Sequence, residues 1–425
     1  MKDTILKTIE AIVTEGASKQ VGHLWANDEN LDLPQIHIED EQLTSFVFCD
    51  YLGLSQDERL IAGATEMLRR YGTYTAVSRA FLSLNLTRTT EELLARVFRQ
   101  PVAVLARTSL AHIAVLPVIT HIDDAIVLDH QVHASVRNAT DMLRSYGNKV
   151  EVIRHNRMDQ LEERIQKLGE IHPKVWYLAD GVYSMYGDTL PAAEIAVLLD
   201  RYPKLHLYVD DAHGMSWMGK HGSGYLLEAL PRHERVFLVT SLGKGFGSGG
   251  AAIVCPDEAT KERIIYCGSP YIFTSPAEPP MLGAIQASAH IHLSDELPIR
   301  QAALMEKITH FRDYALQLGL PLIKPSYLTP IFFIGVGKTE VGYEVCRRMK
   351  AAGYFVSIGI YPAVPVNNTG MRATVTVSHT EAQIKGMLEA LANILPEVLH
   401  ENNSSLEQVY RAFRIKVANN VRKMI

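Results

Sequence analysis

Five polar or glycine-rich stretches follow short apolar runs in the middle of this chain. Asp210, Asp211 and His213 follow "LHLYV", Lys244 lies in "SLGKGFGSGG" after "RVFLVT", and His133 follows "AIVLD". Two further stretches, "GVYSMYGD" and "RTSLAH", follow "KVWYLAD" and "VAVLA". Ligands collect at the carboxyl ends of parallel strands, so these stretches could meet at one site. A helix cap, a structural histidine or a solvated turn would explain each one alone, but their joint occurrence favours a shared site.

The apolar runs that precede these stretches are typical of strands buried on both faces of a sheet. They are continuous in hydrophobicity and rich in β-branched residues, and helical patterns such as "MDQLEERIQKLG" and "PAAEIAVLLDRY" separate most of them. This alternation predicts an α/β protein with a mainly parallel, doubly wound sheet. The seven expected strands cover 102–106, 125–129, 150–153, 174–180, 205–210, 235–240 and 251–255.

The end of the chain has a different pattern and predicts a smaller α/β domain. The apolar runs "LTPIFFIGV", "YFVSIGI" and "MRATVTVS" alternate there with expected helices over 339–351 and 380–396. The tail, 404–425, predicts a basic amphipathic helix packed on its own domain. We therefore expect an N-terminal segment (1–58), a large domain (59–295) and a small C-terminal domain (296–425).

Composition limits the class of protein. The 425 residues are 47% hydrophobic and 21% charged, and the net charge of -5 gives no indication of nucleic-acid or anionic-membrane binding. The longest apolar runs, about ten residues, are too short to span a bilayer. The N-terminus mixes charges into its apolar positions, which is typical of an amphipathic helix and not of a secretion signal.

Cysteine usage bears on compartment and on metals. The chain has four cysteines and no CxxC pair. This pattern favours a reducing cytoplasm and argues against a disulfide framework or a zinc site.

The glycine-rich stretch around Lys244 does not fit a nucleotide loop. A Walker loop needs GxxxxGK followed by a hydroxyl residue, but Gly245 follows Lys244 and Gly243 is the only glycine before it in the loop. The stretch is not a clean GxGxxG fingerprint either. A Schiff base remains, because a lysine amine can bind pyridoxal 5′-phosphate (PLP) covalently.

A PLP site requires four kinds of group. They are a lysine, a carboxylate beside the pyridine nitrogen, a flat group over the ring and donors for the phosphate. The residues that could fill these roles are Lys244, Asp210, His133, Thr108, Ser109 and Ser241.

At these positions the chain resembles the α-oxoamine synthases, a family of PLP enzymes with the fold-type I aminotransferase architecture. The matching stretches follow one another in family order and cover most of the chain. They run from "DYLGL" (50–54) through "TSLAHIA", "DHQVHAS", "DGVYSMYGD", "YVDDAHGMSWMGKHGSG" and "TSLGKGFGSGGAA" to "MRATVTVSHT" (371–380). The resemblance implies a large domain with a mainly parallel seven-stranded sheet and a smaller C-terminal domain.

The resemblance also implies roles for residues around the cofactor ring. Lys244 would hold PLP as a Schiff base and move protons at the substrate α-carbon. Asp210 would pair with the pyridine nitrogen, His213 would hydrogen-bond the phenolic oxygen, and His133 would stack on the ring. Ser184 would lie near the substrate or the ring oxygen.

Other positions would hold the cofactor phosphate. The backbone at Ser109 and Leu110 would do so together with the Ser241 hydroxyl, which replaces a family threonine. Thr274 and Ser275 match a segment that reaches the phosphate from the neighbouring subunit. The resemblance therefore implies a homodimer with shared active sites.

The implied reaction is that of a PLP-dependent acyltransferase. An amino acid would condense with an acyl thioester of coenzyme A or acyl carrier protein, with loss of CO₂, to give an α-aminoketone. Another PLP reaction of the same fold (aldolase, decarboxylase or aminotransferase) is one alternative. A non-catalytic subunit of a heterodimer is another, but such subunits lose the lysine that is present here.

Two departures from the family pattern fall where the substrate would bind. Cys49 stands where many members have asparagine, and Tyr361 stands where many have an arginine that binds the amino acid carboxylate. The remaining candidates for that contact are Arg372 and Arg79. The stretch after "SR" at 78–79 also lacks the family's usual glycine and histidine, which bears on the acyl side of the site.

Overall fold

The computed structural model describes residues 2–230 and 232–415, which form two compact units. The sheet unit comprises Leu52–Tyr183 and Thr189–Gln301. The terminal unit comprises Met1–Tyr51, Ser184–Asp188 and the described part of Ala302–Ile425. The expected boundaries at 58/59 and 295/296 remain predictions. The observed grouping places most of the N-terminal segment with the C-terminal residues.

A seven-stranded sheet forms the centre of the sheet unit, as the sequence predicts. Its order is β3-β9-β8-β7-β6-β4-β5, and β9 is antiparallel to both of its neighbours while the remaining strands share one direction. The strands are β3 (Val102–Leu105), β4 (Ala125–Asp129), β5 (Lys149–Ile153), β6 (Val175–Asp180), β7 (Leu205–Asp210), β8 (Val236–Ser241) and β9 (Ala251–Val254). Each observed strand lies within one residue of its expected bounds.

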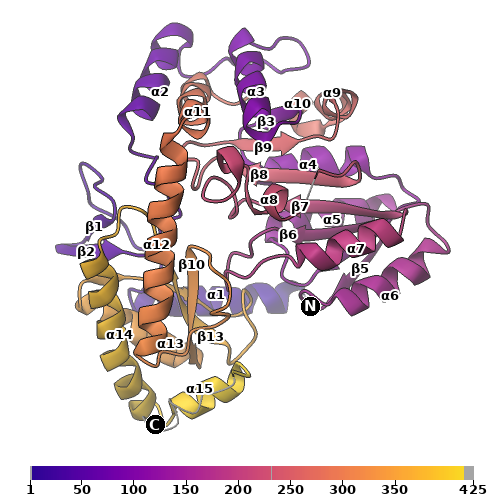
Figure 1. The fold of residues 1–425 in the computed structure, drawn as a ribbon. Helices are drawn as coiled ribbons and strands as arrows, with labels where there is room; N and C mark the ends of the chain where they lie inside the picture. Colours follow the sequence, from indigo (N-terminus) through magenta and orange to yellow (C-terminus); the bar gives the residue numbers. More distant parts are fainter. Residues whose placement is uncertain (1, 231, 416–425) are drawn as a thin grey trace. The chain divides into compact units, whose positions relative to one another are not determined.

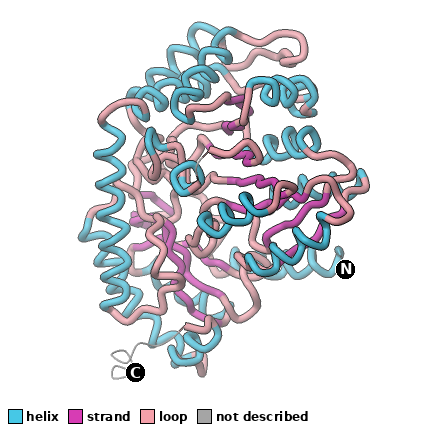
Figure 2. Tube along the Cα trace, turned by 45° about the vertical axis from the view of Figure 1, so that its right-hand side comes forward, coloured by secondary structure: helices cyan, strands magenta, loops and turns pink. Residues whose placement is uncertain are grey.

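Helices cover both faces of this sheet (Figures 1 and 2). Along β7, Leu205, Leu207 and Val209 pack into one core with α6 and α7, while Tyr208 packs into the other core with α4 and α5. Because successive side chains of a strand alternate between faces, burial on both sides requires the continuous apolar runs seen in the sequence. The helices are α3 (Asn85–Phe98), α4 (Thr108–Ile119), α5 (Ala134–Tyr146), α6 (Met158–Gly169), α7 (Ala192–Arg201), η1 (Lys220–Gly222), α8 (Tyr225–Ala229), α9 (Glu258–Cys267) and α10 (Ser269–Phe273).

Two further helices of the sheet unit cross at glycines. A Cβ on Gly63 of α2 (Glu58–Tyr71) would lie 2.7 Å from the Gly283 carbonyl oxygen on α11 (Pro279–His292), and a Cβ on Gly283 would lie 2.2 Å from the Gly63 oxygen. Neither position therefore has room for a side chain.

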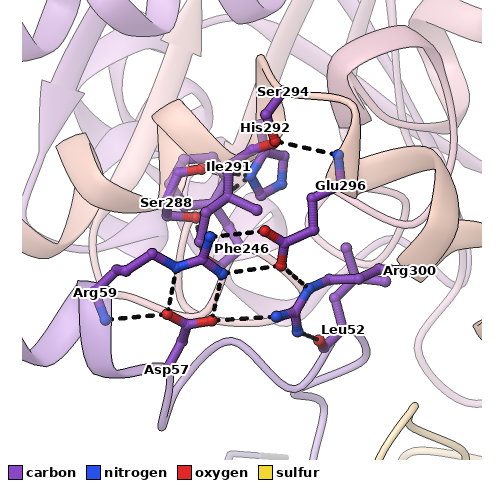
Figure 3. Close-up of polar contacts among 10 residues, drawn as sticks. All are labelled: Leu52, Asp57, Arg59, Phe246, Ser288, Ile291, His292, Ser294, Glu296 and Arg300. Atoms are coloured by element: carbon purple, nitrogen blue, oxygen red, sulfur yellow. Dashed lines mark hydrogen bonds and ion pairs between the residues drawn. The ribbon is translucent and has the colours of Figure 1, made fainter.

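An ion-pair network lies at the start of α2. Arg59 and Arg300 both pair with Asp57 and with Glu296 (Figure 3). It ties the first turn of α2 to the start of α12 (Glu296–Gln317).

The terminal unit contains two small sheets and the remaining helices. One sheet has the order β1-β2-β11 and the other β10-β13-β12. The expected "YFVSIGI" strand is divided between them, since Tyr354–Phe355 pairs with β2 and Ser357–Gly359 pairs with β13. The elements are α1 (Lys2–Ser18), β1 (Gln35–Ile38), β2 (Glu41–Ser45), β10 (Ile331–Gly337), α13 (Thr339–Ala351), β11 (Tyr354–Phe355), β12 (Ser357–Gly359), β13 (Thr369–Thr374), α14 (Glu381–Glu401) and α15 (Leu406–Ala412).

The helices of this unit bear on three expectations. The helix expected over 339–351 is confirmed, and the one expected over 380–396 extends five residues further, to Glu401. The tail helix is present over Leu406–Ala412, while 416–425 lie outside the described residues. Across residues 2–230 and 232–415, the helices are too short or too polar to cross a bilayer.

Candidate functional site

A cavity of about 280 Å³ lies at the carboxyl ends of the central strands of the sheet unit. It collects residues that follow or end β3, β4, β6, β7 and β8, as expected for a parallel sheet. Its lining is Arg107, Thr108, Ser109, His133, Ser135, Asp180, Val182, Asp210, Ala212, His213, Ser241 and Lys244. Residues from three distant parts of the sequence thus face one space: His133, the pair Asp210 and His213, and Lys244.

Asp210 is a buried carboxylate with two fixed partners. Its Oδ2 lies 3.0 Å from His112 Nε2, and its Oδ1 accepts a hydrogen bond from the Ala212 N–H at 3.0 Å. Burial raises the pKa of Asp210, but the interaction with His112, together with the nearby Lys244, holds this pKa below its ordinary value. Asp210 is therefore an anion in the wall of the cavity, and a carboxylate has lone pairs left for a further donor.

His112 was not among the residues singled out from the sequence. It lies in the apolar helix α4, is 0% exposed, and also contacts Tyr208 Oη through Nδ1 at 2.7 Å. The one signal in the sequence is a histidine among the apolar residues that follow "TS" in "TSLAHIAVLPVI".

His133 caps helix α5 and is held as a neutral ring. Its Nδ1 accepts the Ser135 N–H at 3.3 Å and lies 2.7 Å from the Ser135 hydroxyl. Burial lowers the pKa of His133, Asp210 opposes this shift, and Lys244 adds to it. With Nδ1 accepting, the proton of the neutral ring resides on Nε2, and the ring is fixed in orientation at the cavity wall.

Two more buried acids lie near Asp210: Asp211, which the sequence places in the same strand-end stretch, and Asp180, which was not expected as a site residue. Asp180 ends β6, lines the cavity, and accepts the backbone N–H of His133 at 3.1 Å. Burial and then the charge of Asp210 raise the pKa of Asp180 well above its usual range. Asp211 points away into a cradle of glycines, and burial, aided by Asp210, raises its pKa to about 8.

Lys244 lies in a loop that folds back on the end of β8. The Gly247 N–H donates to the Lys244 carbonyl, and the Leu242 N–H donates to the Gly250 carbonyl, at 2.8 and 3.0 Å. Gly247 has a φ of +78°, and a Cβ there would lie 2.4 Å from Leu54 Cβ, so this turn requires glycine. The glycines shape a close-packed turn that presents Lys244 to the cavity.

The first turn of α4 and the end of β8 form another part of the cavity wall. Thr108 and Ser109 begin α4, where Arg107 makes no side-chain capping hydrogen bond, so backbone N–H groups of that turn are available to an anion. The Ser241 hydroxyl lies at the same cavity and accepts the Gly243 N–H at 3.2 Å. Leu110 follows Ser109 in the helix but is not among the cavity-lining residues.

A larger cavity of about 570 Å³ in the sheet unit shares Arg107, Thr108 and Ser241 with the first. Its other walls come from α2, α11 and the glycine loop, and include Ile61, Met281 and Gly247. The two cavities thus share the residues that an anion at the α4 terminus would contact.

Thr274 and Ser275 are in the sheet unit but outside the lining of the smaller cavity. The Thr274 hydroxyl donates to the Pro270 carbonyl, and the Tyr74 hydroxyl donates to the Ser275 hydroxyl. Their expected contact is with the phosphate of a neighbouring subunit, and this stays a prediction.

Arg79 forms a buried ion pair inside the sheet unit. Its Nη1 lies 2.8 Å from Glu91 Oε1, and the two side chains are 8% and 5% exposed. The guanidinium also lies over the ring of Tyr271, 5.2 Å from the centroid. Its charge is already paired, which does not favour a role in binding a substrate carboxylate.

Arg372, Ser184, Cys49 and Tyr361 belong to the terminal unit. Arg372 lies on β13, is 8% exposed, and donates from Nε to the Ser184 carbonyl at 2.6 Å. Cys49 and Arg372 both interact with the buried Tyr51, whose pKa is raised first by burial and then by Cys49, against the opposing charge of Arg372. Tyr361 lies in the loop after β12. Arg372, Ser184 and Cys49 thus form one polar cluster with the buried Tyr51.

The smaller cavity fits PLP by the chemistry of its groups. It offers a primary amine, an anionic carboxylate for a ring nitrogen, an oriented imidazole, and an uncapped helix terminus with a hydroxyl for a phosphate. Across residues 2–230 and 232–415, no group of three or more histidine, cysteine or acidic side chains is arranged to hold a metal ion.

Comparisons with known proteins agree with this chemistry. The family model for aminotransferase class I and II matches residues 50–391. The 8-amino-7-oxononanoate synthase of Chromohalobacter salexigens is 32% identical over 345 residues, covering 81% of this chain and 87% of the relative. The enzyme of the same name from Nitrosococcus oceani is 30% identical over 383 residues, covering 89% and 99%.

Solved structures share the fold. Serine palmitoyltransferase of Sphingomonas wittichii has a TM-score of 0.83 at 21% identity, covering 93% of this chain and 97% of its own. The 8-amino-7-oxononanoate synthase of Francisella tularensis has a TM-score of 0.69 at 23% identity, covering 85% and 99%. The chain therefore belongs to the aminotransferase class I and II family, and it is a PLP-dependent enzyme of fold type I and of the α-oxoamine synthase type.

Proposed function

We propose that this protein is an acyltransferase that condenses an amino acid with an acyl thioester, with loss of CO₂, to form an α-aminoketone. The observation that carries the proposal is that Lys244, Asp210 and His133 face one cavity at the strand ends of a fold-type I sheet. The curated relatives named above are synthases of 8-amino-7-oxononanoate, itself an α-aminoketone.

When bound, PLP supplies an electron sink for the carbanion at the substrate α-carbon. The protein residues prepare that chemistry. Lys244 would anchor the cofactor, and its amine would take and return the proton at the substrate α-carbon. Asp210 keeps the ring nitrogen protonated by charge attraction, because its own pKa is held low.

The remaining cavity residues fix the cofactor in place. His133 would stack on the ring, His213 would donate a hydrogen bond toward its phenolic oxygen, and the α4 terminus with Ser241 would hold the phosphate. We assign the phosphate contacts to the backbone at Ser109 and Leu110, as the family pattern does. The uncapped α4 terminus supports this assignment.

The amino acid carboxylate binds at Arg372 in this proposal. Its Nε bond to the Ser184 carbonyl fixes the side chain, and a planar guanidinium then offers paired donors to a carboxylate. Cys49 and Tyr361 would shape the same pocket and thus the choice of amino acid. Arg79 is the weaker candidate because Glu91 already neutralises it.

We propose that the enzyme is a homodimer in which Thr274 and Ser275 of one subunit approach the phosphate of the other. An exposed apolar patch near this segment supports the proposal, because Phe81 and Phe273 are 88% and 80% exposed. The Ser78 hydroxyl donates to the Ile272 carbonyl, which holds the two segments together. Sedimentation of the wild type and of Phe273→Asp tests this: the variant should shift toward monomer.

The described cysteines Cys49, Cys255, Cys267 and Cys346 are all unpaired, which supports the proposed cytoplasmic location.

Carboxyl-labelled amino acids test the proposed reaction. We expect labelled CO₂ only when an acyl thioester is present, together with an α-aminoketone detected by mass spectrometry. The same amino acid panel should be offered with acyl-coenzyme A and acyl carrier protein thioesters of different chain length. CO₂ release without thioester would identify a decarboxylase. Transfer of the amino group to an oxo acid would identify an aminotransferase, and cleavage of a β-hydroxy amino acid an aldolase. Each of these results would overturn the proposal.

A further inference from the structure

The buried helix α4 carries a histidine that joins two residues of the neighbouring strand β7. His112 Nδ1 lies 2.7 Å from Tyr208 Oη, and its Nε2 lies 3.0 Å from Asp210 Oδ2. Tyr208 and Asp210 are two residues apart on β7, so their side chains leave the same face of the sheet, the face that α4 covers. The imidazole thus spans the gap between them.

Burial of Tyr208 bears on the direction of these hydrogen bonds. Tyr208 is fully buried, and burial and then the nearby charge of Asp210 raise the pKa of its phenol well above the usual range. Its hydroxyl therefore keeps its proton, and we infer that it donates this proton to His112 Nδ1. The other nitrogen, Nε2, then carries the ring proton and donates it to Asp210.

The position of His112 on α4 links it to the other end of the cofactor cavity. Thr108 and Ser109 lie four and three residues before His112, so the three share one face of the helix. The first turn of α4 faces the anion-binding end of the cavity, and the next turn holds Asp210 at the ring end. Helix α4 therefore sets the distance between the anion-binding end of the cavity and Asp210.

Burying an imidazole in an apolar core lowers the stability of the fold unless both ring nitrogens have hydrogen-bond partners. The hydrophobic core around α4 includes Ala111, Val115 and Leu116, and the His112 side chain is 0% exposed. Both ring nitrogens of His112 have partners, so the cost of burying the ring is offset. One of these partners is Asp210, the residue assigned to the cofactor.

We propose that His112, with its tautomer set by Tyr208, is a positioning residue that holds Asp210 ionised and oriented toward the pyridine nitrogen of PLP. The inference rests on the role proposed for Asp210, and His112 itself touches neither cofactor nor substrate. Without the Nε2 donor, the buried Asp210 loses its 3.0 Å contact with His112 and keeps the hydrogen bond from the Ala212 N–H. Its charge becomes less favoured, and so does the proton on the pyridine nitrogen.

The test uses holoenzyme variants and does not require turnover. His112→Leu removes the donor, whereas His112→Gln keeps an amide N–H of similar reach, and Tyr208→Phe removes only the hydroxyl. The readouts are the dissociation constant of PLP from titration of the apoenzyme, and the pH midpoint of the absorbance change of the lysine–cofactor linkage. A ring nitrogen that loses its positive charge allows this linkage to stay protonated to higher pH.

We expect His112→Leu to raise the PLP dissociation constant about tenfold or more and to move the midpoint upward by about one pH unit. His112→Gln should recover much of both effects, and Tyr208→Phe should give a smaller shift in the same direction. In steady state, kcat should fall while KM for the amino acid changes little.

A buried histidine of the same unit that does not contact Asp210 provides the matched control. His292, which Figure 3 draws beside Ser288, is also 0% exposed. Its ring nitrogens contact Ser216 Oγ and the Ser288 carbonyl. His292→Gln should leave the midpoint and the dissociation constant unchanged even where it lowers thermal stability.

Two results would overturn the proposal. One is a wild-type midpoint and PLP affinity in folded His112→Gln, Tyr208→Phe and His112→Leu. The other is an equal shift in His292→Gln, which would indicate a general effect of core damage. If His112→Leu does not fold, Tyr208→Phe decides, because a wild-type midpoint and PLP affinity in that variant would overturn the proposal. Loss of the proposed acyl transfer in the wild type would leave these cofactor readouts intact, so the two failures are distinguishable.

Discussion

Replacing Arg79 by methionine separates a framework role of this arginine from a substrate-binding role. Its Nη1 is 2.8 Å from Glu91 Oε1, and Glu91 also accepts the Val104 N–H at 3.1 Å. Removing one partner of a buried ion pair typically costs about 3–5 kcal/mol, because the other charge is left buried. Lys261 Nζ lies 3.7 Å from the second Glu91 oxygen and compensates in part, so we expect a loss of about 3 kcal/mol.

Urea unfolding of the Arg79→Met variant measures this loss, and the KM for the amino acid is measured alongside. The double variant Arg79→Met/Glu91→Gln should recover at least about 1 kcal/mol, because the uncompensated carboxylate is gone. The KM should change less than about threefold in both, since neither side chain contacts substrate in this account. An Arg79→Met protein with unchanged stability and a tenfold higher KM would refute the reasoning and return Arg79 to the substrate site.

Three further perturbations have outcomes set by the structure. Burial raises the pKa of Asp211 to about 8. Between about pH 4 and pH 8 the folded protein therefore keeps a proton that the unfolded chain has lost. The free energy of unfolding should fall by about 1.4 kcal/mol per pH unit as pH rises through this range. Asp211→Asn should flatten that part of the melting-temperature profile, and a profile as steep as that of the wild type would contradict the assignment. Gly283→Ala would place a Cβ 2.2 Å from the Gly63 carbonyl oxygen and should cost about 1–3 kcal/mol in urea unfolding, whereas wild-type stability would show that α2 and α11 can separate. Ser241→Ala should raise the PLP dissociation constant about two- to tenfold and Ser241→Thr should not, and equal effects of the two would exclude a role for the hydroxyl.

The parts of the fold that rest on hydrophobic pattern could be predicted from the sequence. Six of the seven strands of the sheet unit are almost wholly buried, so each of these is a continuous apolar run with polar residues at its end, whereas the edge strand β5 is mostly exposed or half-buried. The rule that ligands collect at those ends then brings Lys244, Asp210, His133 and His213 to one cavity.

Features that depend on distant contacts could not be predicted in the same way. His112 reads as one polar residue in an apolar helix, and its partners Tyr208 and Asp210 are 96 and 98 residues away. The contacts of Arg79 with Glu91 and with the Val104 carbonyl could not be predicted from the sequence either. The split of "YFVSIGI" into two strands follows from two different pairing partners, β2 and β13, and not from its composition.

Borohydride reduction of the holoenzyme followed by peptide mass mapping tests the central assignment most directly. Reduction converts a lysine–PLP linkage into a stable amine, so the modified residue can be located. The account predicts a pyridoxyl group on Lys244 in the wild type, and no covalent cofactor in Lys244→Ala at equal PLP concentration. A pyridoxyl group on another lysine of the wild type, or an unmodified Lys244 in enzyme that retains PLP, would contradict it.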